Sequence, residues 1–239
     1  MFIPKFSIVI PIYNEKNNIF DLLDEIKKSL NNNDYEYEII IVDDYSSDLT
    51  DYDIKQLNNQ QNCTLIRNTI NIGQSHSLFE GIKKSKFQTI VTIDGDGQND
   101  PKDIILLLNK YFSDQELYLV GGIRNNRKDS LIKIISSKIA NFVRDLILKD
   151  GCKDTGCALK VFNKEAFLSF PFFDGIHRFL PALFKGYSKK TFFLNVNHRQ
   201  RKFGKSKYGT LIRLFKGIND LIKVLKIINT YKKSNDQFF

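Results

Sequence analysis

The alternation of short apolar runs with segments of helical periodicity constrains the fold of this chain more than any other feature. Phe6–Ile12 (F-S-I-V-I-P-I) and Glu38–Val42 (E-I-I-I-V) have the composition of strands buried on both faces. Between them, Ile19–Leu30 repeats its leucines and isoleucines every three to four residues, as a helix does. A strand, a helix and a second buried strand form a βαβ unit, so the chain is predicted to have an α/β fold with a parallel sheet.

The same alternation continues through the first half of the chain. Thr64–Arg67 is predicted to be a short third strand, Gly73–Lys84 a loop that enters a helix, and Thr89–Ile93 a fourth strand. Lys102–Phe112 has helical spacing, and Leu119–Ile123 is a further apolar run. With 239 residues, 42% of them hydrophobic, the chain can bury one large core, with or without an appendage.

The loop T-I-D-G-D-G-Q-N-D-P (Thr92–Pro101) follows the fourth predicted strand. Asp94 and Asp96, separated by one glycine, place two hard oxygen ligands within reach of one divalent cation, which can neutralise a diphosphate. Asp100 before Pro101 is typical of a helix start. The competing interpretation is a solvated Asp/Gly turn. The position favours a site, because open parallel sheets bind ligands at the carboxyl ends of their strands.

A second acidic cluster, beginning with Asp43 and Asp44, follows the second predicted strand. These carboxylates can accept hydrogen bonds from a nucleotide's base and ribose, or they can simply cap a helix and solvate a loop. The chain has no G-x-G-x-x-G after its first strand and no G-x-x-x-x-G-K-[ST] anywhere. Fingerprints of dinucleotide and P-loop sites are therefore missing, and a nucleotide held by carboxylates and a metal is the remaining reading.

Positive charge is concentrated near the C-terminus. The net charge is +9, and the stretch 199–233 holds eleven Lys and Arg against one acid, Asp220, so the rest of the chain is close to neutral. Gly209–Lys233 is predicted to be a basic amphipathic helix, which either packs on its own domain or lies at a membrane surface. Its predicted apolar face comprises Leu211, Leu214, Phe215, Ile218, Leu221, Ile222, Leu225 and Ile228, opposed by Arg213, Lys216, Asp220, Lys223 and Lys226.

The sequence gives no sign of export or metal-binding cysteines. No stretch approaches the roughly 20 apolar residues that cross a bilayer, and the N-terminus has no charged leader, so we expect a cytoplasmic protein. Cys63, Cys152 and Cys157 lack disulfide or zinc spacing. The three histidines are not spaced as metal ligands, which favours hydrogen-bonding roles for them.

Six motifs together resemble those of family-2 glycosyltransferases of the polyprenyl-phosphate type, the group that includes dolichol-phosphate mannosyltransferase. They are V-I-P-I-Y-N-E (9–15), I-I-I-V-D-D-Y-S-S-D (39–48), N-I-G-Q-S-H-S-L-F-E-G-I (71–82), D-G-D-G-Q-N-D-P (94–101), D-T-G-C-A-L-K-V-F (154–162) and R-K-F-G-K-S-K-Y-G (201–209). The resemblance spans about residues 5–225. It implies a GT-A fold, a Rossmann-like mainly parallel sheet flanked by helices, here followed by the basic amphipathic helix.

The resemblance also implies the donor site. Asp94, Asp96 and Gln98 match positions that hold a metal, Mg²⁺ or Mn²⁺, and the donor diphosphate. Arg124 matches a basic residue facing the phosphates; without the family it would read equally as a solvated loop arginine. The residues that match the nucleotide-sugar pocket are Pro11, Tyr13, Glu15, Asp43, Asp44 and Asp94.

The acceptor site is implied by two further motifs. Asp154 lies in a D-x-T-G-like motif, although Cys157 and Ala158 replace the aromatic residue and the arginine that usually follow it. Arg201, Ser206 and Lys207 match an R-x-x-G-x-S-K motif that contacts donor or acceptor phosphate. We therefore assign catalytic roles to Asp96, Asp154, Arg201 and Lys207.

The expected activity is an inverting transfer from a UDP- or GDP-linked sugar to polyprenyl (undecaprenyl) phosphate, for envelope glycans or lipid A modification. We expect a catalytic domain at 1–198 and a basic acceptor- and membrane-facing segment at 199–239, attached peripherally to the anionic cytoplasmic face of the inner membrane. The motifs specify neither the sugar nor the oligomeric state. One alternative is a saccharide hydroxyl acceptor with Asp154 as general base. Another is a non-catalytic nucleic-acid-binding protein, disfavoured because the basic segment resembles no nucleic-acid fold and phosphate binding would not require D-G-D.

Overall fold

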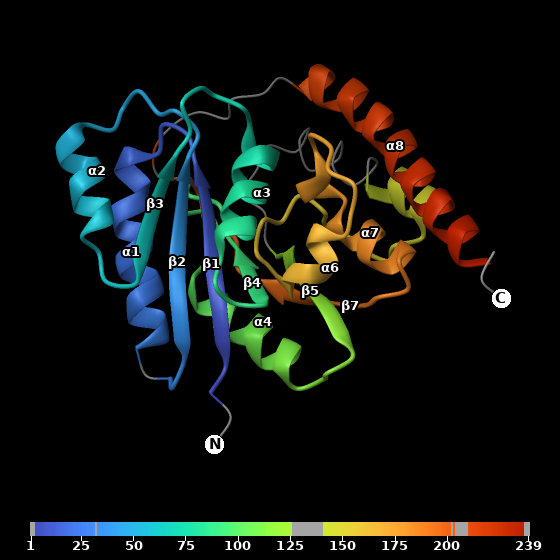
Figure 1. Cartoon of the computed structure of the whole chain (residues 1–239), viewed down its shortest axis with the longest axis horizontal. Coiled ribbons are helices and arrows are strands. Elements are labelled where there is room, and N and C mark those ends of the chain that lie inside the picture. The colour runs from blue at the N-terminus through green and yellow to red at the C-terminus, as the bar shows by residue number, and fades with distance from the viewer. Residues whose placement is uncertain (1–2, 32, 126–140, 202, 204–209, 237–239) are drawn as a thin grey trace.

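The computed structural model describes residues 3–31, 33–125, 141–201, 203 and 210–236. Its centre is one seven-stranded sheet with the strand order β3-β2-β1-β4-β6-β5-β7 and helices on both faces (Figure 1). The strands are β1 (Lys5–Ile12), β2 (Glu36–Asp43), β3 (Cys63–Arg67), β4 (Thr89–Thr92), β5 (Leu117–Arg124), β6 (Lys160–Asn163) and β7 (Lys190–Val196). The helices are α1 (Lys16–Leu30), α2 (Asp51–Asn58), α3 (Gln74–Lys84), α4 (Lys102–Phe112), α6 (Lys164–Leu168), the 3₁₀ helix η1 (Ile176–Arg178), α7 (Leu180–Gly186) and α8 (Thr210–Asp236). Residues 141–148 are also helical.

The first half of the sheet is parallel, as predicted. β1 pairs with β2 on one side and with β4 on the other, and β2 pairs with β3, all in parallel register. The short strand β6 then runs antiparallel between β4 and β5, while β5 and β7 are parallel. The sheet is therefore mainly parallel with one antiparallel insertion, which the sequence analysis did not predict.

The alternation of side chains along the central strands produces two cores. In β2, Ile39 and Ile41 pack with α1 and α4 on one face, whereas Ile40 and Val42 pack with α3, α6 and α7 on the other. Successive strand residues point to opposite faces, so a strand that is apolar throughout must be covered on both sides. This explains why the first predicted strands are nearly continuous runs of Ile and Val.

Helix α8 packs on the second of these cores. Val224 is fully buried and Ile228 is 7% exposed, and Tyr231 stacks on Tyr187 after α7, with ring centroids 3.8 Å apart. The described helices include none that is long and apolar enough to cross a membrane. The C-terminal helix therefore contributes side chains to the folded core.

The face that α8 presents to the core matches the predicted one only in part: Leu221 and Ile228 pack on the core as predicted, but other positions differ. Asp220, expected among the solvated charges, is 1% exposed and accepts a hydrogen bond of 2.7 Å from Arg178 Nη2. Ile218 and Ile222, expected on the buried face, are 49% and 48% exposed. The physical reason is that Arg178 neutralises Asp220. The side of the helix with Asp220, Val224 and Ile228 can therefore face the core, and the side with Ile218 and Ile222 faces solvent. The side chains of Leu211, Leu214 and Phe215 lie outside the described ones.

Candidate active site

The carboxyl ends of three neighbouring strands bring the two predicted acidic clusters together. β1 lies between β2 and β4, with Ile12 opposite Asp43 in the register of β1 and β2 and Val9 opposite Thr92 in that of β1 and β4. The loop after β2 therefore starts at the same edge of the sheet as the D-G-D loop after β4. The predicted convergence on one edge is confirmed.

Glycine is required between the two aspartates of the D-G-D loop. A Cβ atom at Gly95 would lie 2.5 Å from Ile12 Cγ2 and 3.3 Å from the Pro11 carbonyl oxygen. Gly97 has φ +71°, a left-handed conformation that residues with a Cβ atom disfavour. The loop consequently lies against the end of β1 and holds Asp94 and Asp96 there. Asp100, as predicted, accepts the backbone N–H of Lys102 at the start of α4 (3.0 Å).

The carboxyl group of Asp94 lies in an environment that disfavours its negative charge. Burial, followed by the neighbouring Asp96 carboxylate, raises the pKa of Asp94 to about 7, although Lys160 and Arg124 oppose the shift. Gln74 Nε2 donates a hydrogen bond of 2.8 Å to Asp94 Oδ1. The ionised pair thus lacks sufficient compensating positive charge in the protein itself, and a divalent cation would supply it.

The donor set fits a cation that takes further ligands from substrate and water. Within the described residues, no three His, Cys, Asp or Glu side chains are grouped as a metal cage. Mg²⁺ is commonly held by one or two carboxylates together with substrate phosphates, so Asp94 and Asp96 suffice on the protein side. The amide nitrogen of Gln98, the third predicted ligand, lies 3.4 Å from the Arg199 carbonyl oxygen. That contact ties Gln98 to the segment after β7.

Asp43 and Asp44 hold the backbone at this edge. Asp44 accepts hydrogen bonds from the backbone N–H groups of Ile72 (2.9 Å) and Gly73 (2.8 Å) and from Asn68 Nδ2 (2.9 Å). Asp43 is fully buried and accepts from the Ser46 N–H (2.9 Å). Asp44 therefore fixes the entry to α3. Contact of either carboxylate with a nucleotide stays a prediction.

The loops after β1 and β2 are cross-linked and leave two tyrosines exposed. Asn14 donates its backbone N–H to Ser46 Oγ, and its side-chain oxygen accepts the Ser47 N–H, both at 2.8 Å. Tyr45 has φ 65°, a conformation that costs an aromatic residue on the order of 1 kcal/mol or more. Tyr45 is 53% and Tyr13 is 37% exposed. The sequence analysis did not single out Tyr45, and its strained backbone at the sheet edge is visible only in the structure.

Arg124 and Asp154, predicted separately for donor and acceptor, form one unit. Arg124 Nε and Nη2 donate to the two oxygens of Asp154 at 2.7 Å each, and the Arg124 backbone N–H donates to Oδ2 at 3.1 Å. A Cβ atom at Gly156 would lie 2.7 Å from Arg124 Nη2. The glycine of the D-x-T-G-like motif therefore makes room for this bidentate pair, which joins the end of β5 to the loop that holds Asp154.

The segment after β7 returns to the D-G-D loop. Asn197 donates to both oxygens of Asp103, at 2.6 Å from its backbone and 3.1 Å from its side chain, and the Arg199 N–H donates to the Gln98 carbonyl oxygen at 2.8 Å. Arg201 then pairs with Glu15, and its Nη2 lies 3.8 Å from Asp96 Oδ2. Of the predicted phosphate-binding residues, Arg201 is thus at the site, whereas Ser206 and Lys207 lie outside the described residues.

Two residues near Asp94 were missed by the sequence analysis. Lys160, on β6, is 4% exposed and donates to the Cys157 carbonyl oxygen; its charge lowers the pKa of Asp94. A lysine inside the apolar run L-K-V-F was a usable signal, since buried lysines are rare without a partner. Gln74 lies within the motif at 71–82, but only the fold shows that it reaches Asp94.

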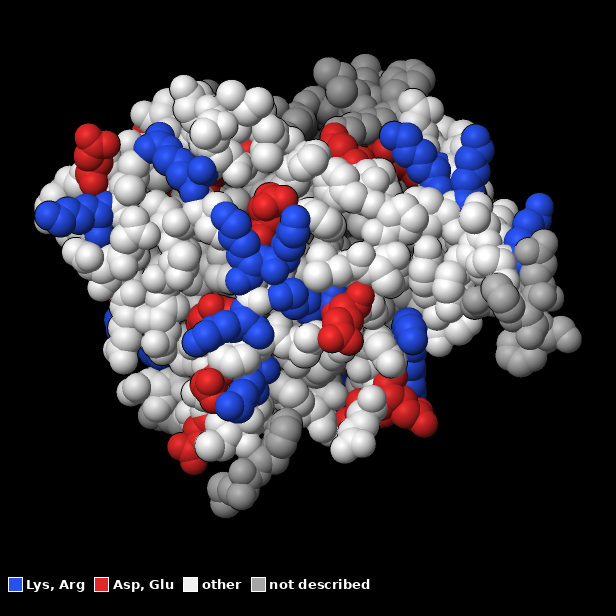
Figure 2. Space-filling view, viewed as in Figure 1, with Lys and Arg blue, Asp and Glu red and all other residues white. Residues whose placement is uncertain are grey.

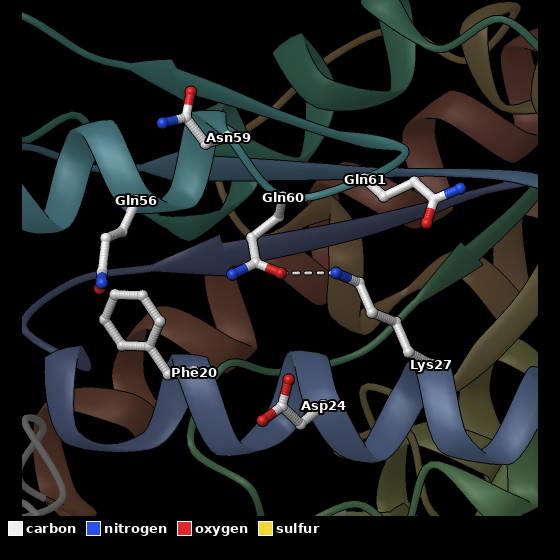
Figure 3. A pocket seen from close by; sticks show the side chains of 7 residues that line it. All are labelled: Phe20, Asp24, Lys27, Gln56, Asn59, Gln60 and Gln61. Carbon is white, nitrogen blue, oxygen red and sulfur yellow. Dashed lines mark hydrogen bonds between the residues drawn. The ribbon is translucent and has the colours of Figure 1, made fainter.

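The hollow between α1 and α2 is separate from this site. It encloses about 670 Å³, and Figure 3 shows its polar lining, with Lys27 Nζ donating to Gln60 Oε1 at 2.5 Å. None of its lining residues belongs to the predicted site. Two of the histidines likewise lie in the framework: Ser75 Oγ lies 2.8 Å from His177 Nδ1, and the His76 ring packs on Phe172. His198 pairs with Asn99 of the D-G-D loop in an isolated β-bridge.

Comparison with known proteins agrees with the arrangement. Residues 7–169 match the model of glycosyl transferase family 2. The chain is 32% identical to dodecaprenyl-phosphate galacturonate synthase of Rhizobium johnstonii, over 98% of this chain and 70% of that protein. It is 31% identical to undecaprenyl-phosphate 4-deoxy-4-formamido-L-arabinose transferase of Yersinia pestis, over 93% of this chain and 68% of that protein.

A solved structure with the same fold is glucosyl-3-phosphoglycerate synthase of Mycobacterium tuberculosis, in complex with Mn²⁺, UDP and glucosyl-3-phosphoglycerate. Its TM-score is 0.69 at 16% identity, over 93% of this chain and 78% of that one. The fold class predicted from the sequence, GT-A, is thereby confirmed. The family model covers well over half of the chain, and the sequence relatives match nearly all of it. The chain therefore belongs to glycosyl transferase family 2.

Proposed function

We propose that this glycosyltransferase moves a sugar from a nucleotide sugar, UDP- or GDP-linked, to a polyprenyl phosphate such as undecaprenyl phosphate. The observation that carries the proposal is the sheet edge where Asp96 lies 3.8 Å from Arg201. Asp94 interacts there with Asp96 and with Arg124, which is paired to Asp154. The names of the two sequence relatives support the acceptor class, since one is a dodecaprenyl-phosphate and the other an undecaprenyl-phosphate enzyme.

On the donor side, Asp94 and Asp96 would hold a divalent cation, Mg²⁺ or Mn²⁺. When bound, such an ion neutralises charge on the leaving nucleoside diphosphate. Arg201 supplies a further positive charge next to Asp96, and Glu15 holds its guanidinium in place. Tyr13 and Tyr45 offer exposed rings on the loops where we place the nucleotide base. Pro11 would border this pocket, because its carbonyl oxygen lies next to Gly95 of the D-G-D loop.

On the acceptor side, the geometry favours a phosphate over a hydroxyl group. A hydroxyl acceptor needs a general base, yet both oxygens of the candidate base Asp154 already accept hydrogen bonds from Arg124. A phosphate monoester, with a second pKa of about 6, is largely ionised at neutral pH and can attack without a base. One in-line displacement then inverts the anomeric centre. Arg201 and Lys207 would position the phosphates for it.

The basic C-terminal segment suggests peripheral attachment to the cytoplasmic face of the inner membrane. Figure 2 shows Lys and Arg side chains spaced along the edge formed by α8. Each basic residue near an anionic surface contributes about 1 kcal/mol, so four or five engaged side chains give reversible binding. We expect the protein to sediment with anionic vesicles and to be released by high salt, since salt screens the attraction. Equal binding to neutral and anionic vesicles would contradict this.

A donor screen tests the catalytic proposal. Nucleotide release is measured for several UDP- and GDP-sugars, with and without polyprenyl phosphate, in Mn²⁺ or in excess chelator. We expect release that requires both the lipid phosphate and the cation. Release driven instead by a saccharide would favour the hydroxyl-acceptor alternative, and release that persists in chelator would contradict the role assigned to Asp94 and Asp96. Duplex-DNA binding across a salt series serves as the test for the nucleic-acid alternative.

A further inference from the structure

Residues 197–201, which follow β7 and are here called the return segment, run along the D-G-D loop in the opposite direction. The pairs in contact, in order along the segment, are Asn197 with Asp103, His198 with Asn99, Arg199 with Gln98, and Arg201 with Asp96. Each step forward along the return segment therefore meets an earlier residue of the loop region, as in a pair of antiparallel strands. The segment is aligned with the loop over its whole length.

Arg199 joins the return segment to two other parts of the molecule. Its backbone N–H donates to the Gln98 carbonyl oxygen at 2.8 Å, and the Gln98 amide nitrogen lies 3.4 Å from the Arg199 carbonyl oxygen. Its guanidinium pairs through Nη2 with Asp100 Oδ1 at 2.8 Å and through Nη1 with Glu25 of α1. The return segment, the D-G-D loop and α1 are thereby held together at one residue.

The two arginines of the return segment that pair with acids have different surroundings. Arg201 pairs with Glu15 and lies near Asp96, and both of these acids belong to the predicted donor site. Arg199 pairs with Asp100 and Glu25, which do not. Arg199 therefore lies beside the site, with its charge offset by two carboxylates, and can act on the reaction only through the residues that it holds.

The ion pairs of Arg199 are better suited to fixing geometry than to stabilising the fold. The side chains of Arg199 and Glu25 are 34% and 35% exposed, and ion pairs exposed to this extent contribute little to stability. They nevertheless restrict where the backbone of the return segment can lie, and Arg201 is only two residues further along the chain. A misplacement of about 1 Å at a group that positions a substrate can slow a reaction about a hundredfold.

We infer that Arg199 is a positioning residue for sugar transfer: its ion pairs with Glu25 and Asp100 anchor the return segment against the D-G-D loop and so keep Arg201 beside Asp96. The inference rests on the proposed function, in which Arg201 binds a phosphate group. Removing the guanidinium of Arg199 leaves the fold intact and loosens the return segment, so the positive charge of Arg201 is no longer held at one place.

A double-mutant cycle in the full chain tests whether Arg199 acts through Arg201. Arg199→Gln alone should lower kcat/KM for transfer to polyprenyl phosphate by about tenfold or more, with a melting temperature close to that of the wild type. In the Arg201→Ala background the same change should lower kcat/KM by less than about threefold, because the residue it positions is already gone. Arg199→Lys, which keeps a charge for one of the two acids, should recover part of the loss. Lys102→Gln, which removes an exposed charge at the start of α4, is the matched control and should leave transfer unchanged.

Hydrogen exchange, measured by mass spectrometry without donor or acceptor, tests the anchoring without relying on activity. The backbone N–H groups of Asn197 and Arg199 donate hydrogen bonds, so their exchange reports how firmly the return segment is held. Exchange in peptides spanning 197–201 should be faster in Arg199→Gln and unchanged in Lys102→Gln.

Two results would overturn the inference. One is unchanged exchange in Arg199→Gln, and the other is an equal fold-loss of kcat/KM on adding Arg199→Gln to the wild type and to Arg201→Ala. If the wild type transfers no sugar to polyprenyl phosphate while Arg199→Gln still speeds exchange, the anchoring role of Arg199 is supported and only the proposed function fails.

Discussion

Replacing Asp94 by asparagine should stabilise the protein when no metal is bound. The pKa of Asp94 rises from 3.8 to about 7 because the carboxylate is buried and lies near Asp96. Each pKa unit corresponds to about 1.36 kcal/mol, so ionised Asp94 costs the fold at most about 4 kcal/mol. Asparagine retains an oxygen that can accept the hydrogen bond from Gln74. Solvent reaches part of the loop and screens the charge, so we expect a gain of about 1–2 kcal/mol.

The sign of the pH dependence follows from the direction of the shift. A carboxyl whose pKa is higher in the folded state than in the unfolded state binds its proton more tightly when folded. The wild-type protein therefore loses stability as the pH rises from about 4 to about 7, and the full cost is present above pH 7. The advantage of Asp94→Asn should be largest at pH 8 and should shrink by about half or more at pH 5.

Urea unfolding in excess chelator at pH 8 and pH 5 measures this advantage. Asp21→Asn, an exposed carboxylate on α1, is the control and should change the free energy of unfolding by less than about 0.5 kcal/mol. Saturating Mn²⁺ should reverse the order, because binding at about a hundred times its dissociation constant adds about 2.7 kcal/mol to the wild type and less to the variant. If Asp94→Asn is no more stable than the wild type at pH 8 in chelator, then ionised Asp94 does not destabilise the fold and the reasoning is refuted.

Four further changes test the framework of the site. Asp96→Ala should slow sugar transfer at least about a hundredfold without lowering the melting temperature, as measured by nucleotide release and calorimetry, because the loop carboxylate carries charge rather than packing. Arg201→Lys should fail to restore the kcat/KM lost in Arg201→Ala, since an ammonium group cannot bind a phosphate through two parallel N–H donors as a guanidinium can; wild-type kinetics would place Arg201 outside the reaction. Gly95→Ala should cost about 1–3 kcal/mol in urea unfolding, because the new methyl meets Ile12, and an unchanged free energy would mean that the loop relaxes freely. Asp220→Ala should cost about 1–3 kcal/mol by leaving Arg178 without this carboxylate, whereas Lys223→Ala on the same helix should cost almost nothing.

The parts of the fold that the sequence predicted are those fixed by local pattern. Strands β1 and β2 are buried on both faces, so their continuous apolar runs identify them and their parallel pairing. Strand β6 is only four residues long, Lys160–Asn163, too short for a period to separate a strand from a helix. Its antiparallel insertion depends on the long return of the chain between β5 and β6, about which local periodicity says nothing.

For the site, the sequence predicted the residue types but not their partners. Arg124 and Asp154 are separated by 30 residues in the sequence, and Gln98 and Arg199 by 101, so only the tertiary fold shows that each pair is in contact. Asp220 was misplaced for the same reason. A single acid among many basic residues is expected in solvent. Asp220 can be buried because Arg178, which is distant in the sequence, pairs with its charge.

The charge around the D-G-D loop supports the proposal that a divalent cation binds together with the donor. Glu15, Asp94, Asp96 and Asp154 are opposed by Arg124, Lys160 and Arg201, so these groups carry one net negative charge when all are ionised. A nucleotide sugar brings a diphosphate with about two further negative charges, which a partly buried site would have to hold uncompensated. A divalent cation would offset both charges of the diphosphate, and the site would then bind its donor without a change in net charge. Lys160 and Arg124 lower the pKa of Asp94, but burial and the Asp96 carboxylate outweigh them, so the pKa stays raised.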